Sequence, residues 1–329
     1  MHDVICLGSA TVDVFVETEK SSATTQYAEG KQERYITYRS GEKILITNLH
    51  FETGGGGTNT AVCFARLGLQ TAYCGNIGED LNGKTILEKL KNEQVDFLGT
   101  TSEDLTNYSI ILDSTLLKDR TILVYKGASE RLLFQRVPSM ACKWLYISSL
   151  SGESFRTAKR LMDQLKPAGT KVAFNPSNYQ IEQHKDEVLQ MIANSDIAVM
   201  NREEAELLVG GGSSEEMLTR LRGLGPTIAI ITNGAQGIVA CDGNKYYRTS
   251  PRQEIPVRET TGAGDCFAST FAAAIALGKD IEESIKWGMI NVENHIQHIG
   301  AKAGLLTRPE INFLLVNDQH QILITPVNQ

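Results

Sequence analysis

The chain has 329 residues, of which 41% are hydrophobic, which is enough apolar material for one large α/β domain or two smaller ones. Its formal net charge is −7, its isoelectric point is near 5.5, and Lys and Arg form no block beyond scattered pairs. We therefore expect no nucleic-acid partner. The longest run of small apolar residues, at 267–277, is too short to cross a bilayer, so we expect no membrane partner either.

The six cysteines show no C-x-x-C spacing, and four of them lie inside apolar runs. Buried free thiols have this distribution, whereas zinc sites and disulfide frameworks have regular spacings. The cysteines therefore predict a reducing compartment and a cytoplasmic protein.

Short runs rich in Val and Ile alternate with longer helical patterns along most of the chain. This alternation is typical of βαβ units around a mostly parallel sheet. Nearly continuous apolar runs also indicate strands that are covered on both faces. The sequence thus predicts a doubly wound α/β fold, with strands at 4–8, 71–77, 143–148, 171–175, 196–201 and 227–232.

Residues 11–48 and 104–126 interrupt this rhythm, because polar and apolar residues alternate in both segments. Such alternation is typical of an antiparallel sheet with one face in solvent. We therefore predict that these segments form a small β-sheet lid. The remaining residues, 1–10, 49–103 and 127–329, would form the α/β core.

The stretch "GEDLNGKT" at 78–85 fits the phosphate-loop pattern G-x-x-x-x-G-K-[ST] at every fixed position. Glu79 and Asp80 would, however, place two carboxylates among the main-chain amides that surround a phosphate in such a loop. We interpret the stretch as a strand-to-helix turn that leaves Lys84 near the start of an exposed helix.

A second stretch, "ETTGAGDCF" at 259–267, is better suited to bind an anion. Gly262 and Gly264 allow close approach of the main chain, and the small residues after them predict a helix whose first amides attract negative charge. Asp265 would lie in the first turn, where it could take the proton of an attacking hydroxyl. An acid at this position is equally explained as a partner of the helix dipole.

The "GAGD" stretch resembles the second signature of the PfkB or ribokinase family of sugar and nucleoside kinases. The stretch "GGGGTNTAVCFARLGLQTAYCGNIGED" at 54–80 resembles the first signature, "NREE" at 201–204 is similar to the family's N-x-x-E, and "TNGAQGIVA" at 232–240 is similar to its late nucleotide-side strand pair. The resemblance covers nearly the whole chain. It implies a ribokinase-like fold.

The same resemblance implies an ATP-dependent kinase that requires Mg²⁺ and transfers the γ-phosphoryl group to a hydroxyl of a small sugar. A nucleoside kinase is the first alternative. The second is a catalytically idle relative that only binds sugar or nucleotide.

In this family Asp265 corresponds to the catalytic base, and the main-chain amides of Gly262, Ala263 and Gly264 would stabilise charge on the transferred phosphoryl group. Our reading of the residues agrees, because amides directed at developing charge are among the largest contributions to such reactions.

The resemblance implies that Asn201 and Glu204, three residues apart, organise Mg²⁺ and its waters around the phosphates. From the residues alone, the same stretch is also typical of a helix N-cap followed by acidic residues. Thr232, Gly234 and Gly237 would border the nucleotide, although a simple turn would explain them without a ligand.

Asp13 corresponds to the family's acid that accepts hydrogen bonds from sugar hydroxyls, and Gly55, Gly56 and Asn59 would line the same pocket. Glycines let a polyol lie against the main chain, although a flexible turn capped by Asn59 explains the run equally well. An acid, an amide and open backbone suit neutral hydroxyls, so we expect an unphosphorylated substrate. We place a free sugar ahead of a nucleoside, because no aromatic platform for a base is evident.

One departure from the family concerns Glu259, since members with a monovalent-cation site typically have Asp at this position. The longer side chain could still bind K⁺ or could shift the loop. Family members often pair through the lid sheet, so a homodimer of this kind is compatible with the sequence.

Overall fold

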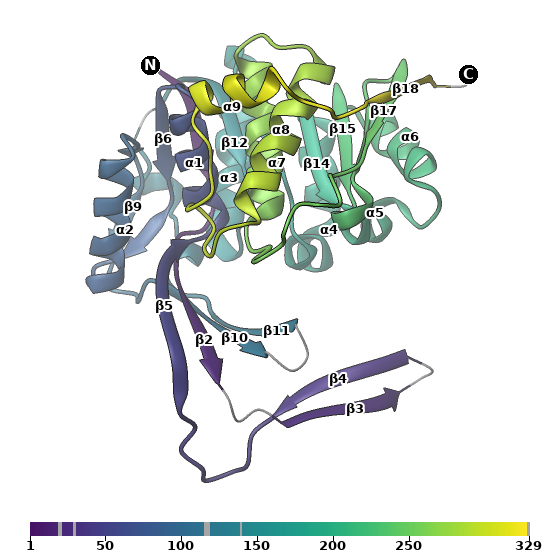
Figure 1. Cartoon of the computed structure of the whole chain (residues 1–329). Helices are drawn as coiled ribbons and strands as arrows, with labels where there is room; N and C mark the ends of the chain where they lie inside the picture. The colour runs from purple at the N-terminus through teal and green to yellow at the C-terminus, as the bar shows by residue number, and fades with distance from the viewer. Residues whose placement is uncertain (19–21, 29–30, 115–118, 139, 328–329) are drawn as a thin grey trace.

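A ten-stranded, mostly parallel sheet forms the centre of the molecule (Figure 1). The computed structural model describes residues 1–18, 22–28, 31–114, 119–138 and 140–327. Neighbouring strands are parallel from β15 to β8, and β16, β17 and β18 add an antiparallel edge. In spatial order the strands are β18 (Leu323–Pro326), β17 (Lys245–Thr249), β16 (Ile238–Cys241), β15 (Ile228–Thr232), β14 (Ile197–Asn201), β13 (Lys171–Phe174), β12 (Cys142–Ile147), β1 (His2–Leu7), β6 (Thr71–Cys74) and β8 (Asp96–Phe97).

Helices cover both faces of this sheet, as a doubly wound fold requires. One face is covered by α1 (Gly56–Arg66), α2 (Leu81–Asn92), α7 (Ala263–Ala276), α8 (Ile281–His295) and α9 (Arg308–Leu315). The other face is covered by α3 (Gly152–Leu165), α4 (Asn178–Ala193), α5 (Arg202–Val209) and α6 (Ser214–Leu224). The six predicted strands of the core are all present, which confirms the predicted fold class.

Strand β1 illustrates why the core strands are apolar throughout. Successive side chains of a strand point to opposite faces, so Val4 and Cys6 pack into one hydrophobic cluster and Ile5 and Leu7 into the other. All four side chains are completely buried. A polar residue in any of these positions would be buried without a partner.

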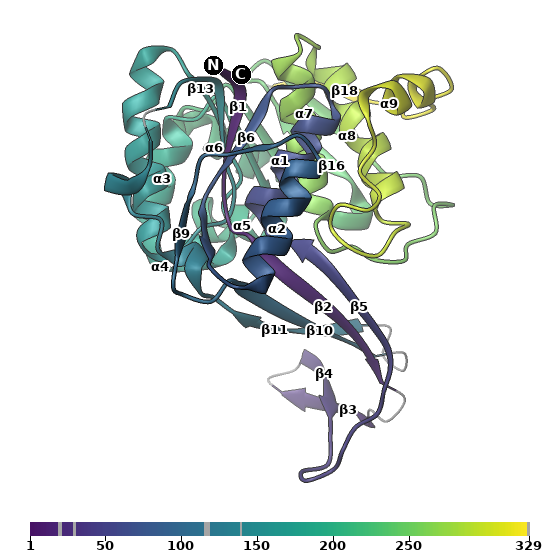
Figure 2. The same ribbon diagram turned by 90° about the vertical axis from the view of Figure 1, so that its left-hand side faces the viewer.

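A second, four-stranded sheet projects from the body (Figure 2). Its order is β11 (Asp119–Tyr125), β10 (Asn107–Ser114), β2 (Thr11–Thr18) and β5 (Ile46–Gly54). The prediction of a purely antiparallel lid was wrong, because β10 and β2 are parallel. Strand β2 is also buried on both sides along most of its length, since it lies between two strands and contributes Val12, Val14 and Val16 to the core. A separate hairpin of β3 (Ser22–Ala28) and β4 (Lys31–Thr37) lies beyond this sheet.

Strand β5 links the lid sheet directly to the α/β body. It continues past residue 48, where we expected the lid segment to end, and reaches Gly54, directly before Gly55, which is the N-cap of helix α1. Its partner β2 likewise begins at Thr11, close to the end of β1. The two strands therefore enter the body side by side at one edge of the main sheet.

The phosphate-loop match at 78–85 is a helix start, as predicted. Asp80 is the N-cap of α2, and its Oδ1 accepts hydrogen bonds from the Gly83 amide (2.7 Å) and the Thr106 hydroxyl (2.7 Å). Lys84 is exposed in the first turn of the helix. The Asp80 carboxylate already accepts the hydrogen bonds that a phosphate would need, so this loop is not available to bind phosphate.

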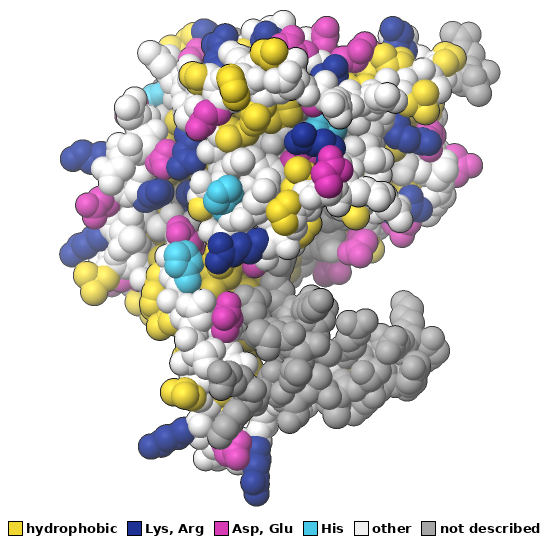
Figure 3. Space-filling model, viewed as in Figure 1, with side chains coloured by type: hydrophobic (Ala, Val, Ile, Leu, Met, Phe, Trp, Pro, Cys, Tyr) yellow, Lys and Arg dark blue, Asp and Glu magenta, His cyan; other side chains and the backbone are white. Residues whose placement is uncertain are grey.

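The surface of the α/β body carries acidic and basic side chains interspersed with one another on the face shown in Figure 3. Within the described part of the chain, no helix combines the length and the apolar character needed to span a bilayer.

Candidate active site

Four loops meet at the carboxyl edge of the main sheet, where open α/β sheets bind their ligands. Helix α1 begins here, and the Gly57 amide donates to the carbonyl of Ser9, just after β1 (3.0 Å). A Cβ atom on Gly56 would lie 2.8 Å from Oγ of Ser148, which follows β12, and 3.4 Å from Oδ1 of Asp265, at the start of α7. The structure thus brings the glycine run and Asp265 together, although they are more than two hundred residues apart in sequence.

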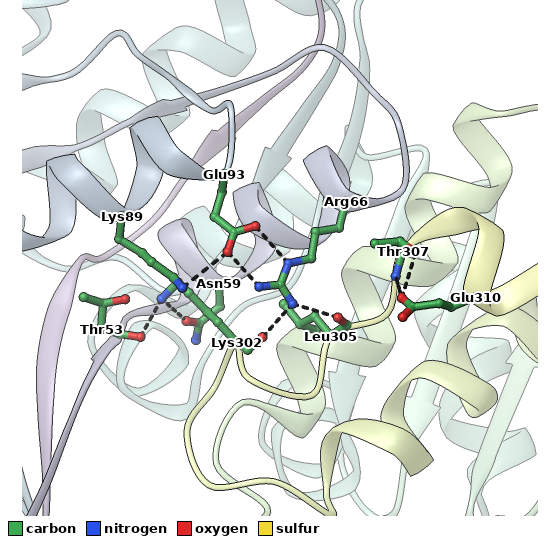
Figure 4. A network of polar contacts seen from close by, with 9 residues as sticks. All are labelled: Thr53, Asn59, Arg66, Lys89, Glu93, Lys302, Leu305, Thr307 and Glu310. Atoms are coloured by element: carbon green, nitrogen blue, oxygen red, sulfur yellow. Dashed lines mark hydrogen bonds and ion pairs between the residues drawn. The ribbon is translucent and has the colours of Figure 1, made fainter.

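Asn59 connects the first glycine-rich stretch to the second. Its side-chain Nδ2 donates to Oδ2 of Asp265 (3.0 Å), and its Oδ1 accepts from Nζ of Lys302 (2.7 Å). Nζ of Lys302 also donates to the carbonyl of Thr53 on β5 (2.7 Å). Figure 4 shows this ammonium between Thr53 and Asn59.

Burial governs the ionisation of these groups. It raises the pKa of Asp265 above its ordinary value, while the Asn59 hydrogen bond and the charge of Lys302 oppose the change. Burial likewise raises the pKa of Asp13 and lowers that of Lys302. Two acids and one base therefore share a partly dehydrated volume, where burial disfavours the charged form of each group and the opposite charges of its neighbours favour it.

The glycine run leaves no room for side chains next to Asp13. A Cβ atom on Gly54 would overlap Oδ2 of Asp13, and one on Gly55 would lie 2.5 Å from the Ser9 carbonyl oxygen. Gly55 has φ +92°, a conformation that L side chains rarely adopt. Glycine is therefore required here on steric grounds, whatever ligand the pocket takes.

The predicted anion loop is a helix N-terminus, as expected. Gly262 is the N-cap of α7 and has φ +78°. A Cβ atom added to Gly262 would lie only 2.8 Å from the Cβ atom of Ala301. The amide of Ala263 already donates to the Thr260 carbonyl (3.1 Å). The amides of Gly264 and Asp265 belong to the first turn, where no intrahelical acceptor is available.

Glu259 fixes the conformation of this loop through hydrogen bonds to its main chain. Its Oε1 accepts from the amides of Thr260 (2.7 Å) and Thr261 (2.8 Å) and from the Thr261 hydroxyl (2.8 Å). His295 supports the loop from α8, since its Nε2 lies 2.9 Å from the Thr261 carbonyl oxygen. The histidine is buried, and burial lowers its pKa, which favours the neutral ring.

Asn201 and Glu204 form a capping box at the start of α5. Oδ1 of Asn201 accepts from the Glu204 amide (2.9 Å), and Oε2 of Glu204 accepts from the Asn201 amide (2.7 Å). The N-cap interpretation of this stretch is thus confirmed. Glu204 is nevertheless buried, which raises its pKa to about 7, so the carboxylate is less stable here than at an ordinary cap.

Thr232, Gly234 and Gly237 lie on the neighbouring strand and its turn. Thr232 pairs with Asn201 in the parallel register of β14 and β15. Gly234 opens a short 3₁₀ turn and is free of close neighbours, whereas a Cβ on Gly237 would overlap the Thr249 carbonyl oxygen. These residues flank Asn201 at the same edge of the sheet.

Lys302 could not be identified as a site residue from the sequence. It lies in "HIGAKAGLL", where a single lysine among small and apolar residues reads as a surface charge. Ser148 was missed for a similar reason, because a serine after a strand has no distinctive pattern. Only the packing of the 296–307 loop against β5 and α1 places Lys302 beside Asn59.

Comparison with known proteins gives one consistent result. The pfkB family carbohydrate kinase profile matches residues 1–302. A ribokinase of Bacillus subtilis is 27% identical over 96% of this chain and all of its own length. The structure of Arabidopsis thaliana ribokinase with ribose and ATP superposes with a TM-score of 0.77 at 22% identity, covering 95% of this chain and 99% of that one. A nucleoside kinase of Methanocaldococcus jannaschii gives 0.79 at 19% identity, covering 97% and 99%.

Proposed function

Because this chain belongs to the pfkB family of carbohydrate kinases, and so is a phosphotransferase with an alcohol group as acceptor, we propose that it phosphorylates a small, unphosphorylated sugar with ATP. The observation that carries this proposal is the hydrogen bond between Asn59 and Asp265, which joins the glycine-lined pocket to the start of α7. A hydroxyl in the pocket would lie between a carboxylate that can accept its proton and amides that attract phosphate.

Asp265 acts as the general base in this proposal. Its raised pKa makes the carboxylate a stronger base than an exposed aspartate. The first-turn amides of α7, Gly264 among them, would stabilise negative charge on the transferred group. The amide of Ala263 is already used within the loop, so we assign it a smaller part than Gly262 and Gly264.

Asp13, Gly55, Gly56 and Asn59 form the sugar pocket. Asp13 is buried and would accept hydrogen bonds from sugar hydroxyls. Because the glycines have no side chain, the sugar ring could approach the main chain closely. A phosphate on the sugar would be repelled by Asp13 and Asp265. These charges support a neutral substrate.

Asn201, Thr232, Gly234 and Gly237 would hold the nucleotide at the adjoining edge of the sheet. For Mg²⁺ we assign Glu204, acting through water. The residues present suit a hydrated divalent cation, because Glu204 is a buried carboxylate and the neighbouring Asn178 Oδ1 is a buried acceptor without a hydrogen-bond partner in the described structure. When bound, Mg²⁺ would neutralise charge on the phosphates.

For Glu259 the hydrogen bonds from Thr260 and Thr261 favour a loop-ordering role over a K⁺ ligand. We expect equal activity in potassium chloride and in tetramethylammonium chloride. A large stimulation by potassium would restore the cation site.

A homodimer through the lid sheet is part of the same proposal. Two strands of that sheet expose large apolar side chains, and 57% of Phe51 and 59% of Val124 are exposed. The exposed set comprises Ile46, Leu49 and Phe51 on β5 and Ile122, Leu123, Val124 and Tyr125 on β11. Apolar surface of this kind is typical of an interface.

Light scattering after size exclusion tests the dimer. Phe51→Asp should convert it to a monomer, while Phe313→Asp, an equally apolar and 74% exposed position on α9, should leave the mass unchanged. A monomeric wild type contradicts the proposal.

We also retain the cytoplasm as the proposed location. The segments 11–48 and 104–126, together with the rest of β5 as far as Gly54, form the proposed lid. All six cysteines are free and buried, which suits a reducing compartment.

A panel of ATP-consumption assays tests the proposed function. Free sugars, phosphosugars and nucleosides should be compared at equal concentration, and we expect a neutral sugar to give the highest kcat/KM. A nucleoside at the top would make the protein a nucleoside kinase. No consumption with any acceptor would indicate a relative that only binds its ligand.

A further inference from the structure

Lys302 is the most completely buried charged side chain near the candidate site. Only 2% of its surface is exposed, although lysine is rarely buried without a carboxylate partner. The loop that carries it is fixed from outside, since Arg66 donates to the carbonyls of Lys302 (3.0 Å) and Leu305 (2.7 Å) and pairs with Glu93 (Figure 4). The loop thus keeps a charged group buried, which costs free energy, and packing alone does not explain why a lysine stands at this position.

The hydrogen bonds of Lys302 determine how Asn59 is oriented. An ammonium can only donate, so the Asn59 atom 2.7 Å from Nζ must be the amide oxygen. The amide nitrogen then faces Asp265, to which it donates at 3.0 Å. With the opposite orientation the Asn59 oxygen would face the Asp265 carboxylate, and two acceptors would repel each other.

The charge of Lys302 also acts on Asp265 directly. Four charged side chains from different elements change the pKa of Lys302. The three acids, Asp13 on β2, Glu52 on β5 and Asp265 on α7, raise it, and Lys89 on α2 lowers it. None of the three acids forms an ion pair with it within 4.0 Å in the described structure. The ammonium therefore offsets the negative charge of all three acids and does not form an ion pair with any single one of them.

We propose that Lys302 is a positioning residue of the site, which locks the Asn59 amide toward Asp265 and favours the ionised form of that carboxylate. This inference rests on the proposed function only where it assigns a catalytic consequence. The hydrogen-bond relay and the charge effect are properties of the protein without substrate.

The experiment measures the titration of Asp265 and needs no substrate. Protein labelled with ¹³C-aspartate is titrated by NMR, and Asp265→Asn assigns the carboxyl signal. Three variants are compared with the wild type: Lys302→Met, which removes the charge at similar length, Lys302→Gln, which is neutral but keeps an N–H donor, and the control Lys89→Met. Lys89 is a nearby, partly exposed lysine that pairs with Glu93 and does not touch Asn59.

In both Lys302 variants we expect the pKa of Asp265 to rise by about one pH unit, the usual effect of losing an opposite charge nearby. We expect no change in Lys89→Met. An unchanged pKa in a folded Lys302 variant overturns the proposal. So does the failure of both variants to fold, since Lys302 would then serve the fold and not the carboxylate.

Kinetics separates this inference from the proposed function. If the wild type turns over a substrate, Lys302→Met should move the acidic limb of the kcat/KM profile about one pH unit higher and lower kcat/KM by up to about tenfold on that limb. Lys302→Gln should lose less at pH values above the limb, because its N–H can still donate to Asn59. If the wild type turns over nothing but the pKa still shifts, the proposed function fails and the role of Lys302 stands. Unchanged kcat/KM in folded Lys302→Met contradicts that role directly.

Discussion

Gly54 and Asp13 lie on neighbouring strands so close together that a Cβ atom on Gly54 would overlap Oδ2 of Asp13. We predict that Gly54→Ala turns the Asp13 carboxylate away from the pocket and raises KM for the sugar at least tenfold, because a positioned charged hydrogen bond is lost. The KM for ATP should change by less than about threefold. Steady-state kinetics with each substrate varied in turn measures both.

A matched substitution controls for the added methyl group. Gly223→Ala, on helix α6, adds a Cβ that meets nothing within 4 Å. It should leave both KM values unchanged and slightly raise the melting temperature. Equal effects of the two alanines on KM would refute the steric argument at Asp13.

Asp265→Asn separates catalysis from stability. We expect kcat to fall by about a hundredfold or more, since Asn cannot accept the proton. The raised pKa of Asp265 means that ionising it weakens the fold as pH rises through that pKa, so the neutral Asn variant should melt about 1–4 °C higher at pH 7–8. Calorimetry and single-substrate kinetics provide the two readouts. Near-normal turnover would remove Asp265 from the role of base.

The pH profile of the wild type gives a related test. Asp265 must be ionised to accept a proton, and its pKa lies above the ordinary aspartate value. We therefore expect kcat/KM to fall on acidification with a midpoint above about pH 4, the ordinary range of an aspartate. A midpoint at or below pH 4 would mean that burial does not control this carboxylate.

Glu204→Gln tests the metal without breaking the helix cap. Gln at this position can still accept the Asn201 amide through its oxygen, so the fold should be retained. We expect the Mg²⁺ concentration for half-maximal activity to rise several-fold. Because the pKa of Glu204 is about 7, the wild type should itself need more Mg²⁺ as pH falls from 8 to 6, and the variant should lose this pH dependence.

The control for this variant is Glu216→Gln. Glu216 closes the same kind of capping box with Ser213 at the surface-exposed start of α6. Its substitution should change neither activity nor Mg²⁺ dependence. A similar loss in both variants would assign the effect of Glu204 to capping alone.

The loop at 78–85 should serve stability only. Lys84→Ala should leave kcat/KM within about threefold, because an exposed lysine at a helix start contributes only tenths of a kcal/mol. Asp80→Ala should destabilise the protein by about 1–2 kcal/mol, since it removes the N-cap and two bonds to Thr106. Urea unfolding and kinetics measure these effects, and a several-hundredfold loss in Lys84→Ala would point to phosphate binding there.

The core strands could be predicted because their apolar runs have a single explanation, burial on both faces. The pairing of β2 with β10 could not, because alternating residues specify which face is buried but not the direction of a neighbouring strand. The "NREE" stretch allowed two interpretations, and the structure shows that Asn201 and Glu204 do form the cap. A local pattern cannot reveal that Glu204 is also buried.

The position of Lys302 beside Asn59 could not be predicted from local sequence patterns. Motifs identified Asp265 and Asn59 as separate features, but their hydrogen bond and the lysine behind it depend on contacts between residues far apart in the chain. A lone lysine has no local signal of burial, since the cost of burying it is offset only by partners contributed from elsewhere.

The order in which the ribosome makes these residues has a consequence for the cell. Asp13 and Asn59 are synthesised early, but Asp265 and Lys302 follow only after two hundred further residues. During translation the partial pocket has Asp13 and its glycines without Lys302, whose ammonium offsets the acidic charge, and without the helix that would bind phosphate. Substrate therefore cannot stabilise the growing chain, and any help in folding before release has to come from chaperones or from the early strands themselves.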